Sequence, residues 1–255
     1  MFSLNRAFVS LITVLTLFIT FPMNSSLAED VPGKFDYYVL ALSWQPAFCE
    51  TRPNKTECVS QDENGFDAKN FVLHGLWPNV RNRGKSYGYC NVPEKFRKRS
   101  WCDLPALKLS KGVRKRLRTF MPGSASCLQR HEWYKHGSCS GLSPDEYYAL
   151  TDKLVRMVSE TEFSKFISAN IGRYVKRNAV LNAFDKEFGK GSRSFLELKC
   201  KTKKGIKFLT EIRIYLRKDL TESDRLKDLL PKQKISVSGR CPGKFKIDRA
   251  GLGNL

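Results

Sequence analysis

The chain has 255 residues, enough for one sizeable domain or two small ones. It carries 45 lysines and arginines against 25 acidic residues, a formal net charge of +20. This excess excludes an acidic or charge-balanced surface and favours polyanionic partners such as nucleic acid, acidic membranes or acidic polysaccharides. A generally basic soluble protein is the alternative.

The first 28 residues have the pattern of a secretory signal peptide. Arg6 precedes an apolar run over residues 7–21, and small residues follow at positions 26–28. The run is shorter than the roughly 20 apolar residues that a transmembrane helix needs. We therefore expect residues 1–28 to be removed, leaving a domain over residues 29–255 with no membrane span. A retained N-terminal anchor is the alternative.

Two apolar segments in the first half of the chain predict buried strands. Residues 35–44 are aromatic and aliphatic throughout, and residues 71–73 form a second, shorter run. Because Gly75 tolerates unusual backbone angles and Pro78 lacks an N–H, we expect the second strand to stop there. The sequence thus predicts His74 at the end of a buried strand.

The next segment is strongly basic. Residues 79–103 predict a long loop, and residues 104–120 a basic helix whose charges form either a solvated face or a surface for polyanions. Ser143 and Glu146 have the spacing of a capping box, so a helix should begin between them. The other expected elements are helices over residues 147–160, 161–169 and 178–189, a hairpin of strands over 195–200 and 208–216, and a last strand over 243–248.

No internal repeat or linker divides these elements. A chain that mixes helices and strands in this way predicts one α+β domain.

The eight cysteines predict a disulfide framework. They are Cys49, Cys58, Cys90, Cys102, Cys127, Cys139, Cys200 and Cys241. An even number behind a signal peptide favours disulfides, and the absence of any Cys-x-x-Cys pair argues against zinc. Eight cysteines allow about 105 pairings, so the connectivity stays open at this point.

Two of the three histidines fall in one short segment, residues 131–139. If residues 131–136 are helical, His131, Glu132, Lys135 and His136 share one face, and two aromatic residues lie behind them. The third histidine, His74, lies in the other conspicuous segment. The chain has only three histidines, and they lie beside opposite charges. We therefore expect them to take part in catalysis.

These residue types suit phosphodiester cleavage in RNA. Two imidazoles can act as a base and an acid, and a neighbouring lysine can stabilise negative charge on phosphorus. RNA supplies its own nucleophile, the ribose 2′-hydroxyl, which DNA lacks. This chemistry needs no metal ion and no cofactor.

Three alternatives are weaker. A zincin-like metal site would need histidines four residues apart, whereas His131 and His136 are five apart and diverge on a helix. Histidines that only satisfy a core, and a serine or cysteine nucleophile, fit the pattern less well. A secreted RNA- or polyanion-binding protein with secondary or lost catalysis is the alternative from a different functional class.

Both histidine segments resemble the active-site segments of the ribonuclease T(2) family. The two segments are residues 74–79, His-Gly-Leu-Trp-Pro-Asn, and residues 131–139, His-Glu-Trp-Tyr-Lys-His-Gly-Ser-Cys. Residues 121–123, Met-Pro-Gly, are similar to the bacterial periplasmic ribonuclease I branch. The resemblance implies a single α+β domain with a mostly antiparallel sheet flanked by helices. It also implies a periplasmic or secreted monomer that acts on single-stranded RNA.

The resemblance also assigns roles to residues. It makes His136 the general base, His74 the general acid, and Glu132 and Lys135 stabilisers of the transition state, while His131 binds phosphate. The products would be a 2′,3′-cyclic phosphate and then a 3′-phosphate.

The base-binding and disulfide assignments come from the resemblance as well. Trp77 corresponds to a residue that stacks on a base, and Asn79 stands where some members place a base-contacting aspartate. The enzyme is expected to have a broad base preference. The implied disulfides are Cys90–Cys139 and Cys200–Cys241. Proximity then favours Cys49–Cys58 and Cys102–Cys127, although other pairings of these four stay open.

Overall fold

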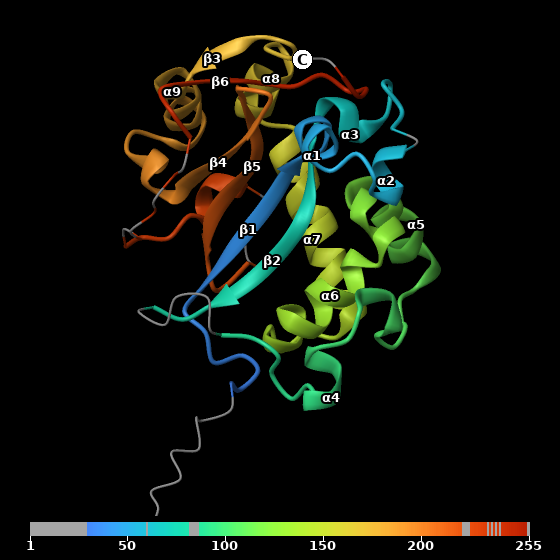
Figure 1. The fold of residues 1–255 in the computed structure, drawn as a ribbon. Coiled ribbons are helices and arrows are strands. Elements are labelled where there is room, and N and C mark those ends of the chain that lie inside the picture. Colours follow the sequence, from blue (N-terminus) through green and yellow to red (C-terminus); the bar gives the residue numbers. More distant parts are fainter. Residues whose placement is uncertain are drawn as a thin grey trace, which may run out of the picture.

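One six-stranded sheet forms the centre of the computed structural model, and helices flank it (Figure 1). The structure describes residues 30–253 apart from 60, 82–86, 221–224, 234, 236, 238 and 240. The proposed signal peptide over residues 1–28 therefore lies outside the described residues. Within them, no helix has the length and apolar character to cross a membrane.

The strands pair in the order β2-β1-β5-β6-β3, and β4 pairs with the other side of β5. They are β1 Tyr37–Trp44, β2 Phe71–Asn79, β3 Tyr174–Lys176, β4 Leu196–Lys203, β5 Ile206–Arg217 and β6 Lys244–Lys246. Among the described residues only β5 and β6 pair in parallel, through Phe208 and Lys246. The expected α+β domain with a mostly antiparallel sheet is confirmed.

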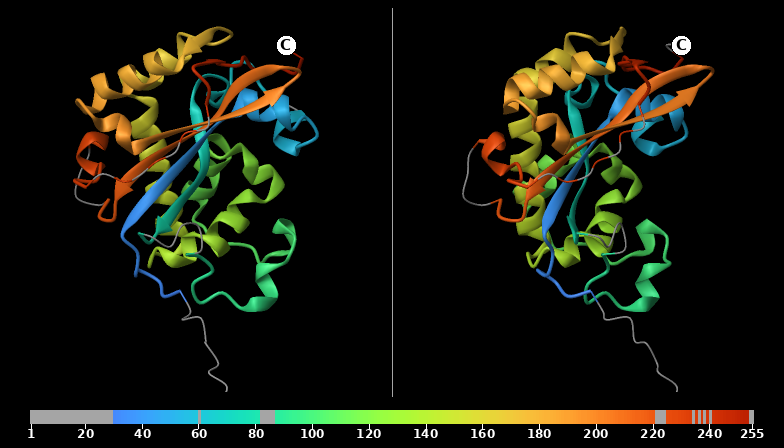
Figure 2. Two further views of the ribbon diagram at one scale, coloured as in Figure 1. Left: turned by 60° about the vertical axis from the view of Figure 1, so that its left-hand side comes forward. Right: turned by 90° about the vertical axis from the view of Figure 1, so that its left-hand side faces the viewer.

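Nine α-helices are described. They are α1 Gln45–Thr51, α2 Thr56–Val59, α3 Phe66–Lys69, α4 Glu94–Arg97, α5 Lys111–Phe120, α6 Leu128–Lys135, α7 Pro144–Ser159, α8 Glu162–Ser168 and α9 Arg177–Phe188. Helices α5, α6 and α7 lie beside β1 and β2, and the long β4–β5 hairpin extends past α1 and α2 (Figures 1 and 2). Ser143 and Glu146 form the predicted capping box of α7.

Strand alternation separates a core face from a polar face. On β5, Ile212, Ile214 and Leu216 are fully buried, while Glu211 and Arg213 alternate with them and point to the other face. The free edge of β2 is covered by α7. The hydroxyl of Tyr147 donates to the carbonyl of Leu76 at 2.7 Å and accepts from its N–H at 3.1 Å. The two buried polar groups of this strand edge are thereby paired.

Three expectations about local structure are wrong. Strand β2 does not stop near Gly75 but continues through Pro78 to Asn79, because β2 is an edge strand and tolerates the missing N–H of proline. The basic helix begins at Lys111 rather than at residue 104. Ser110 caps it, because its side chain accepts a hydrogen bond from the N–H of the third helical residue. The loop over residues 79–103 contains α4 and a 3-10 turn at Trp101–Asp103, and its residues 82–86 are outside the description.

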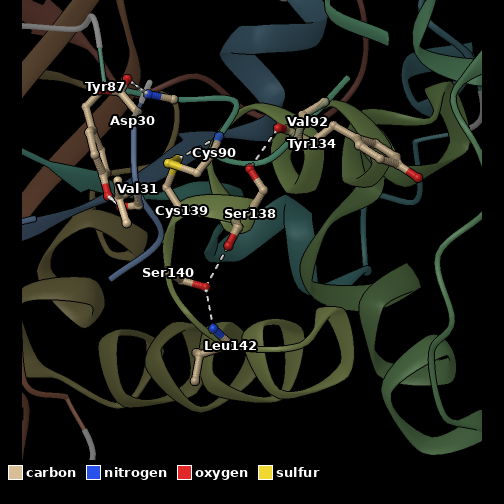
Figure 3. Close-up of a disulfide and its surroundings, with 12 residues drawn as sticks. Asp30, Val31, Tyr87, Cys90, Val92, Tyr134, Ser138, Cys139, Ser140 and Leu142 are labelled. Atoms are coloured by element: carbon tan, nitrogen blue, oxygen red, sulfur yellow. Dashed lines mark hydrogen bonds between the residues drawn. A yellow bond between two sulfur atoms is a disulfide. The ribbon is translucent and has the colours of Figure 1, made fainter. Parts of the chain in front are cut away.

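Four disulfides join the cysteines in the expected pairs: Cys49–Cys58, Cys90–Cys139, Cys102–Cys127 and Cys200–Cys241. Figure 3 shows the Cys90–Cys139 bridge. It ties the segment after β2 to the segment after α6, and the N–H of Tyr89 bonds the carbonyl of Lys135 beside it at 2.8 Å. This bridge therefore fastens together the two parts of the chain that contain the histidines.

The Cys90–Cys139 bridge should contribute more stability than Cys49–Cys58. The two bridges join cysteines 49 and 9 residues apart, and all four cysteines are buried. From loop-closure entropy, replacing both cysteines by alanine should cost about 4 kcal/mol for the first bridge and about 2.5 kcal/mol for the second. Chemical denaturation of the two double variants measures this difference. Equal costs, or the reverse order, would contradict it.

Candidate active site

A β-bulge brings His74 into the site. Ala41 of β1 pairs with Gly75, and the next residue of β1, Leu42, pairs with Leu73, so His74 is the extra, unpaired residue of β2. In a regular strand His74 and Trp77 would point to opposite faces. The extra residue turns His74 to the face of Trp77, and the two rings lie 5.3 Å apart edge to face. His74 thus projects from the middle of β2, not from a strand end.

Glu211 holds His74 from across the sheet. The Nδ1 atom of His74 bonds Oε2 of Glu211 at 2.7 Å. Glu211 lies on β5, opposite Ser43 of β1, and the small side chains of Ser43 and Ala41 leave room for the contact across β1. This hydrogen bond fixes the ring and leaves Nε2 facing the site.

The pair is arranged as an imidazolium and a carboxylate. Burial alone would lower the pKa of His74, but the hydrogen bond with Glu211 and the charges of Glu132 and Glu211 outweigh it and raise that pKa. Burial alone would raise the pKa of Glu211, yet His74 and Arg213 lower it to about 2. At neutral pH, His74 is therefore biased toward its protonated form.

Glu132 joins α6 to β2. Its side chain is buried, Oε2 accepts a 2.7 Å hydrogen bond from the indole N–H of Trp77, and Oε1 lies 3.7 Å from Nε2 of His74. A Cβ atom at position 75 would lie only 2.0 Å from this carboxylate and 2.3 Å from the Trp77 nitrogen. Gly75 is therefore required for close approach rather than for an unusual backbone angle.

Burial raises the pKa of the Glu132 carboxyl, and His74, Trp77 and Lys135 offset this increase only in part.

His136 lies just beyond the end of α6. The helix stops at Lys135, and His136 adopts φ −120° and ψ −52°, so it leaves the helical wheel on which the sequence placed it. Its ring lies 5.2 Å from the ring of Trp77. Trp77 therefore has both imidazole rings as neighbours. The prediction that His136 shares one helical face with His131, Glu132 and Lys135 is therefore wrong. His136 nevertheless lies beside Trp77, in the same site.

The pKa of His136 is shifted in the direction opposite to that of His74. Burial lowers it well below the ordinary value of 6.5, and the positive charge of Lys135 lowers it further. Its Nδ1 is buried and has no hydrogen-bond partner among the described residues, which also disfavours the protonated ring. The pKa values of the two imidazoles are therefore shifted in opposite directions.

His131 is also biased toward its neutral form. Burial and the charge of Lys135 lower its pKa to about 4. Its ring stacks on Trp101 at 4.7 Å, and the ammonium of Lys55 lies 5.2 Å from the centre of the same indole. Behind the site, Trp133 packs edge to face on Tyr147 and anchors α6 in the core.

Asn79 lies at the end of β2, where its side-chain oxygen accepts from the N–H of Val80 at 2.9 Å.

Sequence reasoning missed Glu211 and Arg213. The guanidinium of Arg213 lies 4.8 Å from the ring centre of Trp77 and bonds Oε1 of Glu211 at 2.6 Å. Their only sequence signal is a Glu-x-Arg pair on the polar face of an alternating strand. Glu211 is 137 residues from His74, and the residues around either position do not indicate the contact.

Replacing Glu211 by glutamine should lower the pKa of His74. The variant keeps the shape of the side chain but removes the charge that favours the imidazolium. NMR titration of the ring signals of His74 should give a value above 6.5 in the parent and a clearly lower one in Glu211→Gln. Glu57→Gln is the control, because Glu57 lies in the same pocket as His74 but its described bond is to Ser126. An unchanged His74 titration in Glu211→Gln would refute the pairing.

Comparisons with known proteins identify the family of the chain. The model of the "Ribonuclease T2 family" matches residues 35–225. Ribonuclease I of Escherichia coli (strain K12) is 34% identical, with 86% of this chain and 88% of that protein covered. Ribonuclease S-2 of Pyrus pyrifolia is 26% identical, with 79% and 86% covered. The crystal structure of RNase NT in complex with 5′-AMP is similar in fold, with a TM-score of 0.59, 18% identity, and 84% and 98% covered. The chain belongs to the ribonuclease T2 family, near its bacterial ribonuclease I members, and is an enzyme of that type.

Proposed function

We propose that this ribonuclease is exported and cleaves single-stranded RNA without a metal ion, through a 2′,3′-cyclic phosphate intermediate. One observation carries the proposal: two imidazoles flank Trp77, and their pKa values are shifted in opposite directions. A reaction that needs one base and one acid at the same pH is served by that arrangement.

In the first step the neutral ring of His136 takes the proton of the 2′-hydroxyl. The 2′-oxygen bonds to phosphorus as the bond from phosphorus to the 5′-oxygen breaks, and His74 gives its Nε2 proton to the leaving oxygen. Glu211 fixes the other ring nitrogen of His74, so that Nε2 is aimed at the substrate.

The second step reverses the roles. His74, now neutral, takes a proton from water, and the water oxygen bonds to phosphorus. The bond from phosphorus to the 2′-oxygen breaks, the protonated His136 gives its proton to that oxygen, and a 3′-phosphate remains. The pKa of His74 is raised and that of His136 is lowered, so the free enzyme disfavours the combination that this step needs, neutral His74 with protonated His136. We therefore expect the cyclic phosphate to accumulate before the 3′-phosphate.

The remaining residues act on the phosphate and the base. Lys135 supplies a positive charge that already affects the pKa values of three neighbours. With Glu132 it stabilises the pentacoordinate phosphorus, and His131 contributes a ring nitrogen to phosphate binding. Trp77 offers an indole to the base. Asn79 offers an amide N–H instead of a carboxylate, which suits broad base preference.

Nucleotide binding and export have separate support. The related RNase NT was solved in complex with 5′-AMP. For export, the support is the signal-peptide pattern of residues 1–28 together with four disulfides, which persist in oxidising compartments. We place the protein in the periplasm or outside the cell.

Cleavage of single-stranded RNA in excess chelator tests the proposed reaction. We expect full activity, early 2′,3′-cyclic phosphate ends and late 3′-phosphate ends. His74→Ala and His136→Ala should each lose at least about 10²-fold in rate, since each removes a proton-transfer group. Abolition of cleavage by chelator, or near-normal activity of either variant, would overturn the mechanism. Tight RNA binding with negligible turnover would instead favour a binding protein.

The pH profile follows from the same pair. Cleavage needs neutral His136, whose pKa is lowered below 6.5, so activity should fall at acid pH only below that value. It also needs protonated His74, whose pKa is raised above 6.5, so the alkaline fall should begin above it. In Glu211→Gln the alkaline limb of kcat/KM should move to lower pH while the acid limb stays. A flat profile, or a shift of the acid limb instead, would contradict the assignment of acid and base.

A further inference from the structure

A pocket of about 600 Å³ opens beside His74. Its lining includes His74, Glu211 and Trp101 but not His136. One wall comes from α1 and the segment that leads into α2, and the other from the β4–β5 hairpin, which lie close together in both views of Figure 2. The volume is within the range of roughly 300–1,000 Å³ of sites that enclose small ligands.

The position of His74 fixes which part of the substrate enters this pocket, on the proposed function. His74 protonates the leaving 5′-oxygen and lines the pocket, whereas His136 meets the 2′-hydroxyl and is not part of the lining. The leaving nucleoside, and the strand that continues from its 3′ end, therefore run into the pocket.

Cations line the pocket beyond the histidine. Lys199 and Arg213 form ion pairs with the buried Glu197, which neutralises much of their charge. Arg52, Lys55 and Lys201 also line it, and no ion pair among the described residues involves them. Lys55 is directed by its contact with Trp101. The pocket lining also includes the carboxylate of Glu57, whose described bond is to Ser126, so cations outnumber it three to one and favour a bound anion.

Lys201 lies further along the hairpin than Glu211, which holds His74. Lys199 pairs with Glu211 in the β4–β5 register, and Lys201 follows two residues later on β4, opposite Phe208. Two residues of strand advance by about 7 Å. Lys201 belongs to the hairpin wall of the pocket, and Arg52 and Lys55 belong to the wall formed by α1 and the segment after it. On the proposed function, a strand that continues past the leaving nucleoside runs between these two walls.

We propose that Arg52, Lys55 and Lys201 form a binding site for the next phosphate of the RNA strand, on the 3′ side of the leaving nucleotide. The site increases kcat/KM for substrates that continue beyond the cleaved bond, and it makes the enzyme prefer internal bonds to terminal ones.

Three dinucleotides isolate this contact. ApA ends in a 3′-hydroxyl, and ApAp carries one extra phosphate at its 3′ end, where the proposed site lies. The control, pApA, carries the same extra charge at its 5′ end. For the parent enzyme at low salt we expect kcat/KM to be about 5- to 10-fold higher for ApAp than for ApA, with an advantage that shrinks as salt rises. The ratio for pApA should stay near one.

The double variant Arg52→Gln, Lys201→Gln should bring the ApAp-to-ApA ratio toward one. Lys204→Gln, Lys207→Gln removes the same charge from exposed positions on the same hairpin that do not line the pocket, and it should keep the parent ratio. Thermal unfolding confirms that both variants are folded.

Three results would overturn the proposal. One is a parent enzyme that cleaves ApA and ApAp equally well, which leaves the ribonuclease function intact. Another is an equal loss of the ratio in both double variants, which assigns the effect to general charge. The third is failure to cleave any dinucleotide or longer RNA, which removes the proposed function together with the site.

Discussion

The carboxylate of Glu132 is buried between α6 and β2, and the geometry of the site depends on it. It binds the indole of Trp77, faces the ring of His74 and occupies the space that a side chain at position 75 would need. This contact brings a helix and a strand that are far apart in the sequence to a fixed separation. The Cys90–Cys139 bridge and the bond from Tyr89 to Lys135 fasten the same two segments from the outside. Rotation of α6 about its axis would break all of these contacts at once.

That fixed separation has an electrostatic consequence. Acids surround His74, with Glu211 bonded to it and Glu132 nearby, whereas His136 has Lys135 as its neighbour and a buried ring nitrogen. The two environments shift the pKa values of the two imidazoles in opposite directions. Arg213 lies on the ring of Trp77 and also bonds Glu211, so a single side chain links Trp77 to the partner of His74. On the proposed mechanism, this arrangement is in place before the substrate binds.

Much of this could be predicted from the sequence, because two unbroken segments contain most of the site. The α+β class, the histidine cluster and the helix start at Ser143 followed from residue types and spacing, and the disulfide pairs from the resemblance and proximity. The bulge at His74 could not be predicted, since it depends on how β1 and β2 pair and not on either strand alone. Glu211 and Arg213 were missed for a related reason. On an alternating strand they have the pattern of an ordinary polar face, and only the neighbouring strands show what they contact. The end of α6 at Lys135 was also beyond sequence reasoning, and it changes where His136 points.

The central claim is that the ribose hydroxyl is the nucleophile and that His136 and His74 move its protons. A DNA oligonucleotide with one internal ribonucleotide, incubated with the enzyme in excess chelator, tests this claim most directly. We expect a single cut, on the 3′ side of the ribonucleotide, with a 2′,3′-cyclic phosphate on the 5′ fragment, and no cut in the all-DNA strand. Cleavage at deoxynucleotides, or a 5′-phosphate at the cut, would contradict it.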